Sequence, residues 1–180
     1  MHILVTRRLT MRPPVLPDAE DIALHLSNPT VARMLGPVPH PYWSRDAEEW
    51  IASLAKEPRG LVYTIHRERL IGVVSLDGGG PEPRLGYWLA APCHGRGFMS
   101  EAARALLCHA FATRRIDAVS SSVFIDNPAS LRVQEKLGFV VTGVGDTWCR
   151  ARAATVTTWT TRLTASAFGD PAGSLNKSAA

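Results

Sequence analysis

The chain has 180 residues, of which 46% are hydrophobic and 20% charged, and its formal net charge is +4. This length is typical of one domain with a sizeable core, and the composition excludes a disordered chain. The positive charge occurs in pairs such as Arg7-Arg8, which is typical of a solvated surface and argues against a nucleic-acid partner. No apolar run approaches the roughly 18 residues of a membrane span, and the N-terminus has no signal-peptide pattern, so we expect a cytoplasmic protein.

The first half of the chain predicts a strand, two helices and a strand pair. Apolar Leu9 and Met11 alternate around Thr10, which predicts a strand over 8–12 that ends at a group of prolines. Asp18 and Ser44 are good N-caps, so each is expected to begin a helix with one apolar face. The expected elements are a strand over 8–12, a helix from Asp18 to Leu26, a helical turn over 31–35, a helix from Ser44 to Leu54, and strands over 61–66 and 70–76.

The second half predicts alternating strands and helices followed by a final strand pair. The expected elements are strands over 85–90, 119–125, 140–148 and 154–162, and helices over 99–110 and 128–137. Strands that alternate with helices in the middle, and strand pairs at both ends, predict an α/β chain with a mixed sheet. We expect one domain over 1–168 and a disordered tail over 169–180, where small polar residues dominate. The three cysteines are far apart and odd in number, so no disulfide framework and no metal site is expected.

The segment from Leu85 to Ala102 has the pattern of a strand, a glycine-bearing loop and a helix start. The N–H groups at a helix N-terminus are unpaired, and together with the helix dipole they form an anion site. Gly95 and Gly97 allow positive φ and a close approach to a phosphate, and Arg96 adds charge. The spacing matches neither the dinucleotide fingerprint nor the P-loop. By itself it is equally typical of a tight strand-to-helix connection.

A second motif, Asn127-Pro128-Ala129-Ser130, opens the short helix that ends before Gly138. Together with Gly86-Tyr87-Trp88-Leu89 and His94-Gly95-Arg96-Gly97, in this order and spacing, it resembles the GNAT acetyltransferases. The opening segment 8–21 is similar to the RimJ/RimL-like branch, and the resemblance covers about residues 6–163. It implies a GNAT fold, with a splayed, mostly antiparallel central sheet flanked by helices. It also implies an N-acetyltransferase that uses acetyl-CoA as donor and an amine as acceptor.

The resemblance also assigns site residues by position. The backbone of Leu89 is implied to meet the pantetheine or acetyl group, and Asn127 to approach the pantetheine arm from the other side. Ser130 is implied to lie near the thioester sulfur as the catalytic proton donor. The residues implied to surround the phosphates are His94, Gly95, Arg96, Gly97, Met99 and Ser100.

Two departures from the family pattern concern catalysis. Many members have a tyrosine acid where this chain has Gln134, which leaves Ser130 as the remaining hydroxyl. The branch often has an acidic residue where this chain has Arg84, so the general base stays open. Candidate bases, each also typical of ordinary surface or strand positions, are Asp77, Glu82, Glu101 and His66.

The acceptor is also left open. Met34, Leu35 and Trp43 lie in a segment that walls the acceptor site in relatives, and segment 149–152 often forms the other wall. The latter is more typical of a basic hairpin tip, and the five tryptophans are expected mostly in the core or in pocket walls. The acceptor is expected to be a protein N-terminus or a small-molecule amine, with the enzyme a monomer or homodimer. The alternatives are a catalytically silent acyl-CoA-binding module and a transferase that uses another acyl donor.

Overall fold

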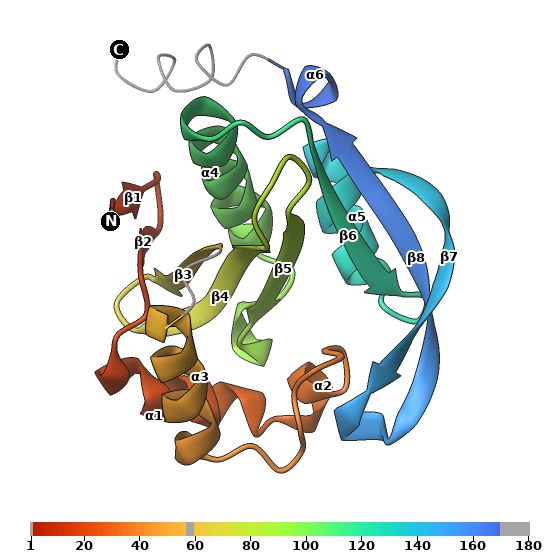
Figure 1. Cartoon of the computed structure of the whole chain (residues 1–180). Helices are drawn as coiled ribbons and strands as arrows, with labels where there is room; N and C mark the ends of the chain where they lie inside the picture. The colour runs from red at the N-terminus through yellow and green to blue at the C-terminus, as the bar shows by residue number, and fades with distance from the viewer. Residues whose placement is uncertain (1, 57–59, 170–180) are drawn as a thin grey trace.

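The protein folds around one eight-stranded sheet with helices on both faces, as the computed structural model in Figure 1 shows. The structure describes residues 2–56 and 60–169, so all but the first residue of the expected tail lies outside the described residues. The strand order is β1-β2-β3-β4-β5-β6-β8-β7, and only the β5–β6 pair is parallel. The predicted mixed, mostly antiparallel sheet is therefore confirmed.

The elements follow the predicted order with small shifts at their ends. The strands are β1 (Leu4–Val5), β2 (Thr10–Arg12), β3 (Leu61–His66), β4 (Leu70–Asp77), β5 (Arg84–Leu89), β6 (Ala118–Phe124), β7 (Val140–Cys149) and β8 (Ala154–Thr164). The helices are α1 (Ala19–Leu26), α2 (Pro29–Ala32), α3 (Ser44–Lys56), α4 (Phe98–Thr113), α5 (Pro128–Leu137) and α6 (Ala165–Phe168). Within the described ranges, no helix combines the length and the apolar character needed to cross a membrane.

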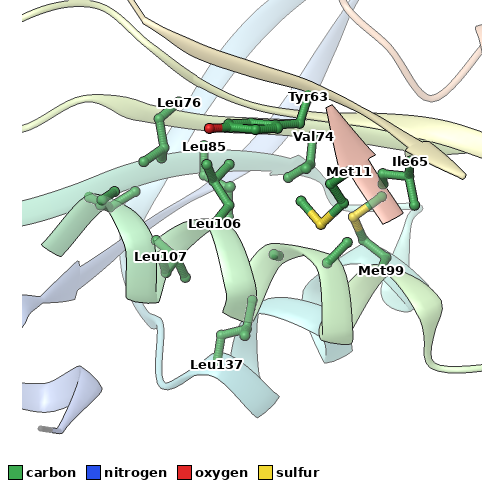
Figure 2. Packing of buried hydrophobic residues seen from close by; sticks show 14 of the residues in the cluster. Met11, Tyr63, Ile65, Val74, Leu76, Leu85, Met99, Leu106, Leu107 and Leu137 are labelled. Carbon is green, nitrogen blue, oxygen red and sulfur yellow. The ribbon is translucent and has the colours of Figure 1, made fainter. Parts of the chain in front are cut away.

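The main core lies between the sheet and helix α4. Leu106 and Leu107 of α4 are fully buried, and they pack against side chains from the neighbouring strands (Figure 2). Tyr63, Val74 and Leu85 come from three adjacent strands and face the same helix. A second cluster under α1 and α3 covers the opposite face of β4 and β5. The two clusters hold β5 between helix layers, which fixes the strand that leads into the glycine loop.

The strand predicted over 8–12 is shorter in the structure, because Arg8 forms hydrogen bonds with Glu101 of helix α4 instead of pairing in the sheet. Its backbone N–H donates to Oε1 of Glu101 at 3.0 Å, and its Nε donates to Oε2 at 2.6 Å. The strand β2 therefore begins only at Thr10. This pair ties the start of the chain to the first turn of α4.

Asp18 does not cap α1 as predicted, since its side chain makes no hydrogen bond to the helix N-terminus. Its carboxylate accepts two hydrogen bonds of 2.7 Å from the guanidinium of Arg12 and one of 2.9 Å from the N–H of Val15. The residue is only 7% exposed. A bidentate pair with a guanidinium joins two full charges, whereas a cap would pair the carboxylate only with a backbone N–H, so Asp18 binds Arg12 instead of capping α1.

We expect Asp18→Asn to destabilise the protein and to reduce its acid sensitivity. Burial alone would raise the pKa of Asp18, but the bonds from Arg12 and Val15 outweigh it and hold that pKa below its ordinary value. The carboxylate therefore stabilises the fold fully above its unfolded pKa of about 3.9, and this contribution is lost as the pH falls toward the folded pKa. At pH 7 the variant should lose about 3 kcal/mol of unfolding free energy, because Arg12 keeps its charge without a counterion.

Urea denaturation at about pH 7 and about pH 3 measures both effects. Asp21→Asn is the matched control, because Asp21 lies three residues later, in the first turn of α1, in a looser pair with Arg69 at 3.5 Å. Equal losses for the two variants would contradict the role given to Asp18.

Candidate functional site

The sheet opens between β5 and β6. These two strands share a single parallel register pair, Arg84 with Ser120, and then diverge toward their C-terminal ends (Figure 1). Backbone N–H and C=O groups along a strand edge need partners when the neighbouring strand leaves. The splay therefore offers backbone hydrogen-bonding groups to an extended ligand that carries amides of its own.

The glycine loop leads into the first turn of α4. Gly95 has φ +72° and Gly97 has φ +76°, so the predicted positive φ is confirmed at both positions. The N–H of Glu101 makes a helical hydrogen bond with the carbonyl of Gly97 at 3.1 Å. The N–H groups of the three preceding residues, 98–100, consequently have no acceptor within α4. Since the loop residues 94–97 are exposed, these donors lie beside an open loop.

Three arginines surround the ring of Phe98 at this helix start. The guanidinium carbons of Arg8, Arg96 and Arg67 lie 4.6, 5.0 and 5.3 Å from the ring centroid. The sequence had indicated only Arg96. Arg8 comes from the segment before β2 and Arg67 from the β3–β4 turn, and both are distant from the loop in the sequence. Glu101 offsets the charge of Arg8, so an excess of positive charge remains beside the loop. Such a field attracts a multiply charged phosphate ligand.

His94 and Met99 contribute less to this anion site than their positions suggest. The side chain of Met99 is 5% exposed and belongs to the core, which leaves only its backbone N–H. The N–H of His94 donates to the carbonyl of Ala91 at 3.2 Å, and its Nε2 lies 2.9 Å from the carbonyl oxygen of Leu89. A carbonyl only accepts, so Nε2 carries the hydrogen. The imidazole thus joins the loop to the end of β5 by a hydrogen bond.

The start of α5 presents Ser130 to β5. Asn127 caps this helix, since its Oδ1 accepts from the N–H of Ser130 at 3.1 Å and its NH₂ group remains a donor. The Oγ of Ser130 lies 2.8 Å from the phenol oxygen of Tyr87, and that phenol oxygen also lies 3.1 Å from the backbone carbonyl oxygen of Ser130. A second hydroxyl, that of Tyr87, therefore lies beside Ser130, where the sequence led us to expect Ser130 alone. Tyr87 was part of the strand motif but received no role from the sequence.

Gln134, in the place of the family's tyrosine, belongs to a buried polar network. It is 1% exposed, its Nε2 donates to Ser121 Oγ at 2.8 Å, and its Oε1 accepts from Thr161 Oγ1 at 2.6 Å. Ser121 in turn donates to the carbonyl of Leu85 at 2.9 Å. The chain of bonds joins α5, β8, β6 and β5, and it fixes the helix that carries Ser130.

We expect Gln134→Met to lower the unfolding free energy by about 2 kcal/mol, because the buried hydroxyl of Thr161 loses its acceptor. The measurement is the urea midpoint, with Glu135→Met as the matched control on the exposed side of the same helix. If the two variants unfold at the same urea concentration, the network does not stabilise the fold.

Two candidate bases, Asp77 and Glu82, lie at the wrong end of β5. Asp77 is in register with Arg84, at the beginning of that strand, whereas the splay opens toward Leu89. Arg84 and Leu89, at the two ends of β5, are about 16 Å apart at roughly 3.3 Å per residue. Burial raises the pKa of Asp77, but the residue lies at the opposite end of β5 from the splay opening. Glu82 forms an ion pair of 3.0 Å with Arg162.

The other two candidates, Glu101 and His66, are engaged elsewhere. Burial alone would raise the pKa of Glu101, but hydrogen bonds from Thr6 and Arg8 outweigh it and lower that pKa. His66 lies beside β2, with its Nε2 3.0 Å from Thr64 Oγ1. None of the four predicted bases is therefore placed beside Ser130. Among the described residues, no group of three or more His, Cys, Asp or Glu side chains is arranged to hold a metal ion.

The two predicted acceptor walls contact each other. Arg152 in the β7–β8 connection donates to the carbonyl of Arg33 at 2.6 Å and to Asp126 at 2.8 Å, and Cys149 Sγ lies 3.5 Å from the carbonyl of Leu35. Figure 1 shows α2 beside this connection. We call this cluster of Arg33, Asp126, Cys149 and Arg152 the clasp.

Two of the five tryptophans are exposed. Trp43 is 66% exposed and Trp148 is 57% exposed, so neither belongs to the core. Trp148 lies on the edge strand β7, and Trp43 immediately precedes α3. The other three tryptophans are partly buried, as expected.

A splayed sheet beside a glycine loop and an open helix start suits an extended ligand that carries amides and phosphates. The family described as acetyltransferase (GNAT) domain matches residues 8–140. The chain therefore belongs to the GNAT acetyltransferase family.

Known proteins agree with this assignment. The chain is 31% identical over 151 residues to the uncharacterized N-acetyltransferase YoaA of Bacillus subtilis, covering 79% of this chain and 85% of the relative. Its fold matches the structure of RimL, a ribosomal L7/L12 alpha-N-protein acetyltransferase in complex with coenzyme A. The TM-score is 0.80, with 20% identity over 91% of this chain and 98% of the other. A spermidine N-acetyltransferase from Vibrio cholerae, in complex with CoA and spermine, matches with a TM-score of 0.78 and 19% identity over 91% and 99%.

Proposed function

We propose that this protein transfers the acetyl group of acetyl-CoA to a primary amine by direct attack within a ternary complex. The observation that carries the proposal is the placement of the α4 helix start and the Ser130 hydroxyl on the two sides of one splay. The phosphates bind the loop over 95–100, and pantetheine extends between Leu89 and Asn127. This arrangement brings the thioester to the start of α5.

The chemistry follows from these positions. A neutral amine attacks the thioester carbon, and the N–H of Leu89 donates to the developing oxyanion. In a strand the N–H and C=O of one residue point to the same edge, so this N–H faces the splay like the carbonyl that His94 binds. Such a preorganised donor acts where charge develops. Ser130 then supplies the hydrogen for the departing sulfur, and positioning accounts for most of the remaining acceleration.

Charge at the clasp bears on the choice of acceptor. Arg33 and Arg152 both approach Asp126, and the exposed Arg150 follows Cys149, so positive charge exceeds negative charge there. A polyamine is repelled by such a field, whereas an amine that carries an anionic group is attracted. The acceptor supported best is a protein N-terminus followed by acidic or neutral residues, or a small amine with a carboxylate or phosphate.

An acceptor screen monitored by free-thiol release tests the function. The panel contains peptides with acidic second and third residues, the same peptides with lysines there, spermidine, and amino acids, and mass spectrometry identifies the acetylated product. We expect release above hydrolysis with the acidic peptides or anionic amines, and less with spermidine. Acetyl-CoA binding without release for any acceptor would favour the silent binding module instead. Competition with succinyl-CoA tests the alternative donor.

A further inference from the structure

Tyr87 and Ser130 form a hydroxyl pair across the splay. Tyr87 lies on β5 opposite Val74, partly buried against the main core, with its ring on the α5 side of the sheet. Its phenol oxygen is 2.8 Å from Ser130 Oγ and 3.1 Å from the backbone carbonyl oxygen of Ser130. Two side chains separated by 43 positions thus meet at the start of α5.

This geometry allows two hydrogen arrangements. In the first, Tyr87 donates to the backbone carbonyl and Ser130 donates to the phenol oxygen, so the serine hydrogen is occupied. In the second, Tyr87 donates to Ser130 Oγ, and the serine hydrogen is directed elsewhere. Burial raises the pKa of Tyr87 above its ordinary value, against the opposing hydrogen bonds of Ser130 and Gln134. The phenol therefore keeps its hydrogen throughout the neutral pH range.

We propose that Tyr87 is a positioning residue that directs the hydrogen of Ser130 toward the sulfur of the acyl donor. The inference rests on the proposed function. As the C–S bond breaks, its electron pair remains on sulfur, which takes the proton of Ser130. The proton of Tyr87 replaces it on Oγ. The attacking amine loses one proton to water, and water returns one to Tyr87, so the net transfer is from nitrogen to sulfur.

Linked hydroxyls polarise each other, which makes the pair a better donor than an isolated serine. In this chain the phenol comes from strand β5, whereas the family pattern places a tyrosine in the helix at the position of Gln134. The chain thereby keeps a phenol near the sulfur although α5 has none at that position.

The thiol pKa of bound coenzyme A tests the proposal without any acceptor. Thiolate absorbance is titrated in complexes of CoA with the parent protein and with Ser130→Ala, Tyr87→Phe and the double variant. Donors that face the sulfur stabilise the thiolate, so Ser130→Ala should raise the thiol pKa by about one unit. Tyr87→Phe should raise it by about half a unit, and the double variant should match Ser130→Ala.

Tyr63→Phe is the matched control, because Tyr63 is a buried tyrosine on the same face of the sheet, in register with Val74. It should leave the thiol pKa unchanged. If Tyr87→Phe does not fold, Tyr87→Met removes the same hydroxyl. A parent-like thiol pKa in the Tyr87 variant, or additive shifts in the double variant, would overturn the proposal while leaving the proposed function intact. Failure of the parent protein to bind CoA would overturn both.

Discussion

Replacing Ser130 with alanine is expected to lower kcat about 100-fold while leaving the affinity for acetyl-CoA nearly unchanged. The Ser130 hydroxyl lies at the start of α5 and faces Tyr87 across the splay at 2.8 Å. A group that donates to the departing sulfur acts in the transition state, so kcat and kcat/KM should fall together. Steady-state kinetics with the best acceptor of the screen, and calorimetry for acetyl-CoA affinity, separate the two effects.

Ser122→Ala is the matched control for this prediction. Ser122 lies on β6, where its hydroxyl accepts from Arg84 near the beginning of β5, away from the splay opening. Its removal should change kcat little. An unchanged kcat in Ser130→Ala would remove Ser130 from the mechanism and leave solvent as the proton source.

Gly97→Val is expected to abolish detectable acetyl-CoA binding. Gly97 immediately precedes α4 with φ +76° and ψ 4°, and a side chain there would extend over the helix start. The nearest atom to an added Cβ is Nη2 of Arg8 at 3.5 Å, so the fold has room for it. The new side chain would instead occupy space that a phosphate needs to reach the backbone N–H groups. The left-handed backbone also costs a β-branched residue about 1–2 kcal/mol, so the variant should be less stable as well.

Gly80→Val separates backbone strain from loss of the anion site. Gly80 has φ +98°, an added Cβ meets nothing within 4 Å, and the residue lies in the β4–β5 turn. This control should lose comparable stability and still bind acetyl-CoA, as calorimetry with both variants would show. Binding by Gly97→Val as tight as that of the parent would place the phosphates elsewhere.

Local signals in the sequence predicted the elements whose ends have distinctive residues. Helix α5 begins at Pro128, after the cap Asn127, and ends before Gly138, which has φ +95°, and both ends agree with the prediction. Strand β1 escaped prediction because two residues carry no periodicity and pair only with β2. Asp18 was assigned to a cap because its local position fits one, but Arg12 binds it more strongly.

In the candidate site, too, features set by a local motif were predictable and contacts between distant segments were not. The positive φ of Gly95 and Gly97 follows from a local motif and was predictable. Contacts between distant segments were not, since no periodicity links Tyr87 with Ser130 or Arg8 with Glu101, which are 43 and 93 positions apart. The same holds for the four candidate bases: strand register separates Asp77 and His66 from the splay opening, and contacts with distant segments engage Glu82 and Glu101.

Thermal unfolding with and without acetyl-CoA tests most directly the claim that this fold binds the donor at the α4 helix start. A ligand that binds only the folded state stabilises it by RT ln(1 + [L]/Kd), about 2.7 kcal/mol at a free concentration of 100 Kd. We therefore predict that Tm rises steadily with acetyl-CoA concentration in the parent protein and stays constant in Gly97→Val. An unchanged Tm of the parent protein at millimolar acetyl-CoA would contradict the account.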